Sequence, residues 1–167
     1  MYLSKLFNSQ RSFSAKAFAG QTPLGVFKHL EKEAVELEED PSDLLEWADC
    51  FILTIDGAMR SRPTVASPEW CAIRTTEAMR EKSKLVTRVR SIESFKAYLN
   101  EFPSDDLDSP HAWTYLTAIL VNLAGHYGIS PQQLYNVVER KIDINKSRKW
   151  GAVDPNNPDQ PIHHIEE

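Results

Sequence analysis

The stretch over residues 28–56 constrains the fold most, because it combines two amphipathic helical patterns with inward-facing acidic residues. It contains two carboxylate pairs at i, i+3 spacing, Glu33/Glu36 and Glu46/Asp49, which are separated by a turn signal. At about 100° per residue, the first pair falls at the edge of an apolar helical stripe. That stripe consists of Val26, Phe27, Leu30, Ala34 and Leu37.

The second half of this stretch predicts another helix with carboxylates on or beside its buried face. Its apolar stripe consists of Leu45, Ala48, Ile52, Ile55 and Met59. Asp49 and Asp56 fall within or beside the stripe, Glu46 flanks it, and Cys50 is expected on the outer face. We expect Asp56 to orient a metal ligand or a lysine, or to pair with a structural cation, without binding a metal itself.

Inward-facing carboxylates need cations nearby, since an ionised carboxylate buried without a partner is costly. The loop between the two helices is short, so the helices must pack antiparallel, which brings the acid pairs face to face. Lys and Arg side chains can supply the cations, and so can Mg²⁺ or Mn²⁺, which prefer oxygen ligands. Four carboxylates have room for two or more ions, as in two-metal phosphate chemistry. The alternative is ordinary acids on amphipathic helices, because Glu is a strong helix former.

The composition indicates one globular domain over residues 1–167 and argues against several classes of protein. The net charge of −5 argues against binding to nucleic acid, whose phosphates call for a basic surface. No apolar run is long enough to span a membrane. Cys50 and Cys71 lack a metal-type spacing and are expected as free thiols, which is typical of a cytoplasmic protein.

Helix-start signals recur along the chain and predict an all-α fold. Thr22-Pro23 predicts a helix over 23–38, and Asp40-Pro41 predicts a second helix up to about residue 60, with Asp40 as its N-cap. The further expected elements are helices at 69–90, 91–102, 111–127 and 131–150, loops at 61–67 and 102–110, and an extended tail over 152–167.

The helix expected over 131–150 has an apolar stripe that becomes cationic partway along. Its members are, in order, Leu134, Val137, Val138, Lys141, Asn145 and Arg148. Cations lining one groove can bind a polyphosphate, and Arg can do so bidentately. The alternative is a solvated helix end, where the helix dipole favours basic residues. Together with the inward carboxylates, the pattern favours phosphate binding.

Aromatic and histidine side chains near the two ends of the chain are weaker candidates for binding. Trp150 either stacks on a base or anchors the tail to the core. Phe13 and Phe18 are the other aromatic candidates for base recognition, although core packing explains them equally well. His163 and His164 are adjacent and point apart in most conformations, so we expect them on the surface and not as ligands.

Three segments resemble the all-α nucleoside triphosphate pyrophosphohydrolases, the MazG-like superfamily, and are most similar to the dATP/dGTP diphosphohydrolase branch of phages and bacteria. The shared pattern is Glu-x-x-Glu on one helix, Glu-x-x-Asp on the next and Lys-x-x-x-Asn-x-x-Arg on a later one. The segments read SFSAKAFAGQTPLGVFKHLEKEAVEL, DLLEWADCFILTIDGAMR and GISPQQLYNVVERKIDINKSRKW. The resemblance begins near the N-terminus, so residues 13–20 look like part of the domain and not like a transit peptide.

The resemblance implies a MazG-like helical bundle that hydrolyses a purine deoxynucleoside triphosphate, dATP or dGTP, to the monophosphate and pyrophosphate. Water would attack the α-phosphorus, with two or more Mg²⁺ or Mn²⁺ ions per site. It further implies a homodimer or homotetramer in the cytoplasm of a bacterium or a phage-infected host. The metal positions are matched by Glu33, Glu36, Glu46 and Asp49, and the phosphate-contacting positions by Lys141, Asn145 and Arg148.

The chain differs from the family pattern in two places. Lys32 precedes Glu33 where many superfamily members have another Glu. Residues 61–127 are expected as a family-atypical helical insertion, serving as a subdomain, a lid or an oligomer contact.

The alternative functions are hydrolysis of dUTP or another pyrimidine nucleotide by the same fold, and a non-catalytic helical interaction module whose acids pair with Lys141 and Arg148.

Overall fold

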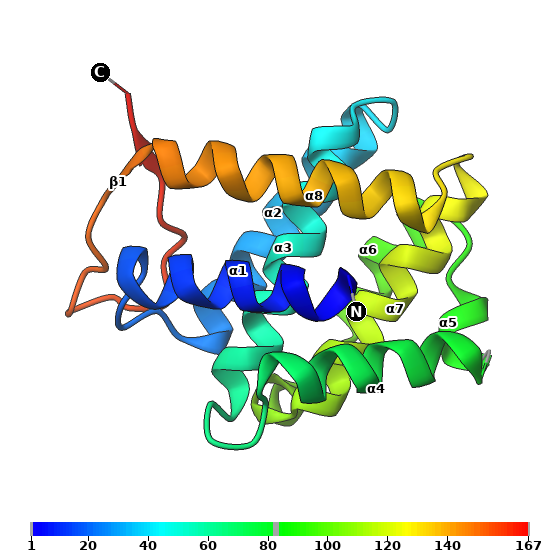
Figure 1. The fold of residues 1–167 in the computed structure, drawn as a ribbon, viewed down its shortest axis with the longest axis horizontal. Helices are drawn as coiled ribbons and strands as arrows, with labels where there is room; N and C mark the ends of the chain where they lie inside the picture. The colour runs from blue at the N-terminus through cyan, green and yellow to red at the C-terminus, as the bar shows by residue number, and fades with distance from the viewer. Residues whose placement is uncertain (1, 82–83, 167) are drawn as a thin grey trace.

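The computed structural model describes residues 2–81 and 84–166, and these residues are mostly α-helical (Figure 1). A two-residue antiparallel strand pair is the one sheet in the described chain. The elements are α1 (Tyr2–Ala17), α2 (Pro23–Glu39), α3 (Leu44–Ser61), α4 (Pro68–Arg80), α5 (Lys84–Arg88), α6 (Ile92–Asn100), the 3₁₀ helix η1 (Ser104–Asp108), α7 (Pro110–His126), α8 (Pro131–Ser147), β1 (Lys149–Trp150) and β2 (His164–Ile165).

The predicted all-α bundle is confirmed, with several differences in where helices begin and end. The capping signals did not predict α1, which occupies most of the first 17 residues. The helix expected over 69–90 is divided into α4 and α5, with residues 82–83 outside the described part. The helix expected over 131–150 ends at Ser147, because Arg148 is its C-cap in an extended conformation.

The N-caps of the central helices explain where α2 and α3 begin. The Thr22 hydroxyl accepts a hydrogen bond from Gly25 N at 3.0 Å, as the sequence predicts. The predicted cap of α3 is wrong: Asp43, and not Asp40, caps this helix, accepting from Leu45 N at 2.8 Å. Asp40 instead ends α2 and binds Ser42 in the turn.

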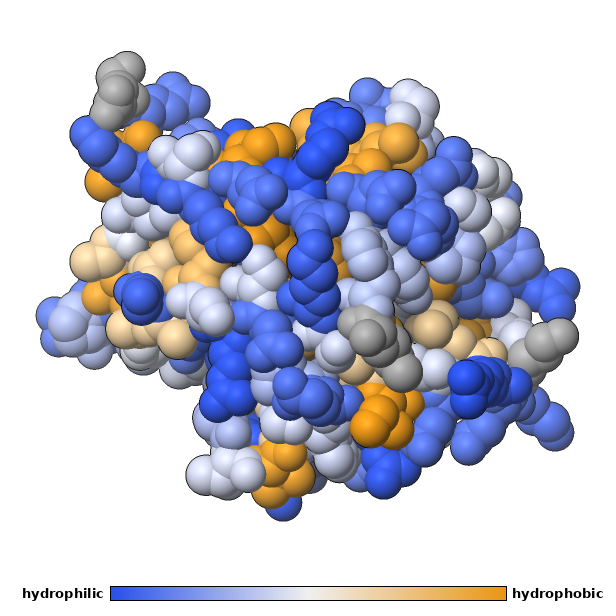
Figure 2. All heavy atoms as spheres, in the orientation of Figure 1, coloured by the Kyte–Doolittle hydropathy of each residue, from blue (hydrophilic) through white to orange (hydrophobic). Residues whose placement is uncertain are grey.

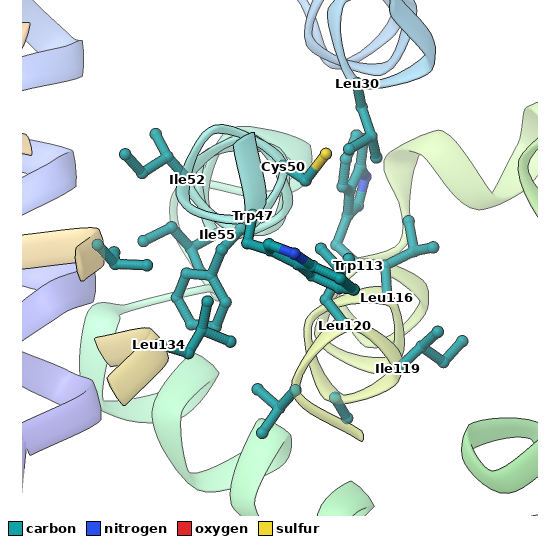
Figure 3. Close-up of a cluster of buried hydrophobic side chains, with 14 of the residues drawn as sticks. Leu30, Trp47, Cys50, Ile52, Ile55, Trp113, Leu116, Ile119, Leu120 and Leu134 are labelled. Carbon is teal, nitrogen blue, oxygen red and sulfur yellow. The ribbon is translucent and has the colours of Figure 1, made fainter. Parts of the chain in front are cut away.

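The helices α2 and α3 form an antiparallel hairpin, and α7 packs against α3 (Figures 1 and 3). Trp47 and Trp113 are fully buried between these helices, so residues 61–127 contribute to the same core through α7. The predicted outward position of Cys50 is wrong. Its sulfur is buried and points from α3 toward Leu30 of α2 (Figure 3). Both cysteines are free, as predicted.

Helices α1 and α8 lie side by side across one face of the hairpin and run in the same direction (Figure 1). Lys5 of α1 pairs with Glu139 of α8 at 2.6 Å, and further along, Lys146 Nζ donates to Ser9 Oγ at 2.9 Å. The face seen in Figure 2 is mostly hydrophilic, with small scattered apolar patches. None of the described helices is long and apolar enough to cross a lipid bilayer.

The C-terminal tail folds back over the ends of α1 and α2. The Thr22 hydroxyl donates to Asp159, and the β1–β2 pair places Trp150 opposite His164. Between the two strands the tail has turns and irregular backbone, as the Pro-rich sequence predicts. The tail thereby forms one wall of the main cavity.

Candidate active site

A cavity of about 300 Å³ opens between α1, α2, α3, α8 and the tail. It contains every acidic residue of the predicted metal motif and every cationic or amide residue of the predicted phosphate-binding motif. The lining is made by Gln10, Phe18, Gln21, Val26, His29, Lys32, Glu33, Glu36, Glu46, Asp49, Ile52, Leu53, Asp56, Lys141, Asn145, Arg148, Trp150, Ile162, His163 and His164.

Three carboxylates from the α2–α3 hairpin converge in this cavity. Glu33 of α2 and Glu46 and Asp49 of α3 each offer one oxygen, and these oxygens all lie within 4.8 Å of one another. Glu33 is 7% exposed, which follows from its position at the edge of the apolar stripe of α2. The antiparallel packing of the hairpin therefore brings the acid pairs together, as the sequence predicts.

Two basic side chains contact the acidic cluster. His29 Nε2 lies 2.9 Å from Glu33 Oε1, one helical turn earlier on α2. Burial alone would raise the pKa of Glu33, but the hydrogen bond to His29 and the charges of His29, Lys32 and Lys141 outweigh it and lower that pKa. Lys141 Nζ of α8 lies 2.9 Å from Asp49 Oδ2. Burial still raises the pKa of Asp49, because Lys141 offsets only part of the desolvation cost.

Glu46 is the least satisfied member of the cluster. Its Oε2 is buried and accepts no hydrogen bond from the described residues. Burial, followed by the negative charges of Asp49, Glu33 and Glu36, raises the pKa of Glu46 from 4.5 to about 6. The cluster thus holds more negative charge than its protein partners compensate.

This donor set fits a divalent metal ion. Glu33, Glu46 and Asp49 offer only carboxylate oxygens, which are the ligands preferred by Mg²⁺ and Mn²⁺. A divalent cation there would supply Glu46 Oε2 with a partner and offset the crowding that raises its pKa.

Glu36, the fourth acidic residue of the motif, lines the same cavity but lies outside this three-oxygen group. Its side chain is 41% exposed and pairs with Lys32 Nζ at 2.6 Å. This contact raises the pKa of Lys32. Lys32 therefore holds Glu36 at the rim of the cavity.

Two residues of the C-terminal motif reach the cavity from helix α8, and the third reaches it from the residue that follows the helix. Lys141 and Asn145 lie one turn apart on α8 and are 8% and 7% exposed. Arg148 follows the helix, is exposed, and forms no ion pair with the residues that the structure describes. The cap conformation, and not a continued helical stripe, directs Arg148 to the cavity.

The aromatic candidates gather where the tail meets α1. Phe18 packs edge-on against Trp150 with ring centroids 4.9 Å apart, and both line the cavity. Phe13 packs against Phe18 and Trp150 from behind and does not line it. His163 and His164 are exposed, as predicted, yet both contribute to the cavity wall.

Asp56 pairs with a structural cation, which is one of the roles expected from the sequence. Its Oδ2 accepts from Arg60 Nε at 3.0 Å, one turn later on α3. Arg60 also donates to the carbonyls of Gln21 and Ser14 and to the Ser14 hydroxyl. This network fixes the end of α1 and the start of α2 against α3.

Sequence reasoning missed His29, Gln10 and Gln21 as cavity residues. The position of His29 was readable, because it precedes Glu33 by four residues and so lies on the same face of α2. The positions of Gln10 and Gln21 depend on how α1 packs on the hairpin, which no local pattern specifies.

A family model described as dATP/dGTP pyrophosphohydrolase matches this chain twice, over residues 6–91 and 84–167. The match includes the acidic hairpin, α8 and the tail. Searches of curated proteins and of solved structures returned no match. Because the family model covers nearly the whole chain, the protein belongs to the dATP/dGTP pyrophosphohydrolase family.

Proposed function

We propose that this protein hydrolyses a purine deoxynucleoside triphosphate, dATP or dGTP, to the monophosphate and pyrophosphate by attack of water on the α-phosphorus. One observation carries the proposal: three carboxylates converge in a cavity whose wall also holds Lys141, Asn145 and Arg148. Acids that bind metals and bases that bind phosphates are the two components that phosphoryl chemistry requires. The family description names the purine substrates.

Each motif residue has a role in this proposal. Bound Mg²⁺ or Mn²⁺ supplies an activated water and offsets charge on phosphate oxygens. Glu33, Glu46 and Asp49 would hold the metal, and we infer that Glu36 adds a ligand or orients water from the rim.

The cationic side of the cavity would bind the leaving group. Lys141 and Arg148 would bind the β- and γ-phosphates, with Asn145 donating a neutral hydrogen bond. Lys141 would then exchange its contact with Asp49 for a phosphate oxygen, and Asp49 would be free to hold the metal.

The chief rival is a non-catalytic helical module, and the ion pair between Lys141 and Asp49 is the observation in its favour. A pyrimidine substrate such as dUTP is the second alternative. The homodimer or homotetramer implied by the resemblance stays a prediction, which the mass of the protein in solution tests.

Pyrophosphate release from the four dNTPs and dUTP, with Mg²⁺ or Mn²⁺, tests the proposed function. We expect metal-dependent turnover of dATP or dGTP, and a loss of about 100-fold or more in kcat for Asp49→Asn, because metal-bound water is central to the reaction. Asp143→Asn, an exposed acid on α8, is the matched control and should keep full activity. Preference for dUTP would support the pyrimidine alternative, and no turnover would contradict the proposal.

Thermal unfolding separates the enzyme from the salt-network module. A metal that binds only the folded state, at a concentration 100 times its Kd, stabilises that state by about 2.7 kcal/mol. Mg²⁺ or Mn²⁺ should therefore raise the Tm of the wild type. Asp49→Asn should abolish most of this rise, whereas Glu36→Gln should retain part of it, because Glu36 lies outside the three-oxygen group. A wild-type Tm unaffected by either metal would favour the module.

A further inference from the structure

The side chain of Gln10 combines nearly complete burial with an unused hydrogen-bonding atom at the main cavity. This residue of α1 is 1% exposed and lines the cavity. Its Oε1 accepts no hydrogen bond from the described residues. Buried polar atoms are almost always paired, because leaving one unpaired costs free energy on folding. An unpaired amide oxygen at a cavity wall is therefore a candidate ligand-binding group.

From the attachment of α1 we infer that Gln10 lies toward the end of the cavity away from the acidic cluster. Helix α1 is attached to the far end of α3 through the hydrogen bonds from Arg60 to Ser14, which is one turn beyond Gln10. On α3, Asp56 lies seven residues after Asp49, or about 10 Å along the axis. Because α2 runs antiparallel to α3, Val26 of α2 lies toward the end of the cavity near Asp56, and Glu33 lies at the acidic end.

The surroundings of Gln10 suit a flat heterocycle. Val26, Ile52 and Phe18 line the cavity as apolar side chains, and Trp150 packs edge-on against Phe18. Gln21 also lines it, with a buried Oε1 that lacks a partner among the described residues. A nucleotide whose phosphates reach Lys141 and the acidic cluster would extend its base toward this apolar, amide-bearing end.

We propose that Gln10 is a specificity-determining residue whose amide binds the exocyclic edge of the purine base. This inference rests on the proposed function. Its carbonyl oxygen accepts from an amino or ring N–H group, and its NH₂ group donates to a carbonyl or ring nitrogen. Adenine and guanine both present such an edge, whereas unsubstituted purine lacks the exocyclic groups. Sites that hydrogen-bond a substrate group discriminate strongly against analogues that lack it.

The test compares kcat/KM for dATP, dGTP and the 2′-deoxyriboside triphosphate of unsubstituted purine. We expect the wild type to prefer dATP or dGTP over the unsubstituted analogue. Gln10→Met keeps the length of the side chain and removes its polar atoms, so this preference should fall by about tenfold or more. Gln132→Met, at an exposed glutamine on α8, is the matched control and should leave the preference unchanged. Gln10→Leu is the second variant, should Gln10→Met not fold.

The outcomes separate this inference from the proposed function. A wild type that turns over no nucleotide overturns the proposed function, and the inference with it. If the wild type is active and both folded Gln10 variants keep the base preference of the wild type, the inference alone is overturned. Equal losses on all three substrates also overturn it, because they indicate a general effect on the site and not a contact with the base edge.

Discussion

The surroundings of Glu46 show that the site carries excess negative charge. Its carboxylate is crowded by Asp49, Glu33 and Glu36, and one of its oxygens is buried without a partner among the described residues. Asp49 and Glu33 each have a basic partner, whereas the structure gives Glu46 none within the described residues. Removing its charge should therefore relieve repulsion in the metal-free protein.

We expect Glu46→Gln to raise the Tm of the metal-free protein above neutral pH. The pKa of Glu46 rises from 4.5 in the unfolded chain to about 6 when folded, so the folded state binds this proton more tightly. The resulting contribution to stability is present below about pH 4.5 and is lost as the pH rises through about 6. The Tm advantage of the variant should thus be largest at about pH 7.5 and vanish toward pH 4.5, as measured by thermal unfolding in EDTA.

Glu39→Gln, at an exposed acid of the same hairpin, is the control for this experiment and should show no comparable pH-dependent difference. A Tm difference between Glu46→Gln and the wild type that does not change with pH would contradict the electrostatic account. With saturating metal the sign should reverse, because the variant loses a carboxylate ligand.

At the scale of elements, the contact between α3 and α7 depends on Gly57. A Cβ at this position would lie 2.3 Å from two ring atoms of Trp113. Trp113 is fully buried, its indole donates to the Leu107 carbonyl at 2.9 Å, and it packs against Phe27 and Phe102. The ring has no open side into which it can move, so the glycine sets how closely the two helices approach.

Gly57→Ala should lower the free energy of unfolding by about 1–3 kcal/mol, because overpacking outweighs the better helix propensity of alanine. Urea unfolding measures the change. Gly125→Ala in α7 is the matched control, since a Cβ there meets nothing within 4 Å, and it should stabilise by up to about 1 kcal/mol. If both variants are stabilised to the same extent, the close contact does not determine the packing of α3 on α7.

At the scale of the whole molecule, Arg60 joins parts of the chain that are distant in sequence. Its guanidinium binds Asp56 on α3, Ser14 on α1 and the Gln21 carbonyl before α2. Asp56 is 5% exposed, so its charge depends on this partner. The network holds α1, and with it one wall of the cavity, against the hairpin.

Arg60→Met should destabilise the protein by about 3–5 kcal/mol, because it leaves the buried Asp56 without its cation. The double variant Asp56→Asn/Arg60→Met should recover part of this loss, since no buried charge then remains. Arg74→Met, at an exposed ion pair on α4, should change stability by less than about 1 kcal/mol. Chemical denaturation of the wild type, Asp56→Asn, Arg60→Met and the double variant gives the coupling energy, and a coupling near zero would contradict the role of the ion pair.

The sequence alone predicted the all-α class, the antiparallel hairpin and the convergence of Glu33, Glu46 and Asp49. Helical periodicity and the short connection between α2 and α3 sufficed for this, because both are local properties of the chain. The N-cap of α3 was predicted wrongly, since Asp40 and Asp43 both stand in a capping context and only the folded backbone decides between them.

Only the tertiary structure decided which faces meet and which groups stay unpaired. A helical pattern identifies an apolar stripe but not its neighbours. It therefore placed Cys50 outside, although Cys50 is fully buried where α2 and α7 pack on α3. The same limit hid Gln10, because its place in the cavity depends on how α1 packs along α8 and across α3. Local periodicity thus determined the acidic end of the cavity, and the packing of distant segments determined the rest of its wall.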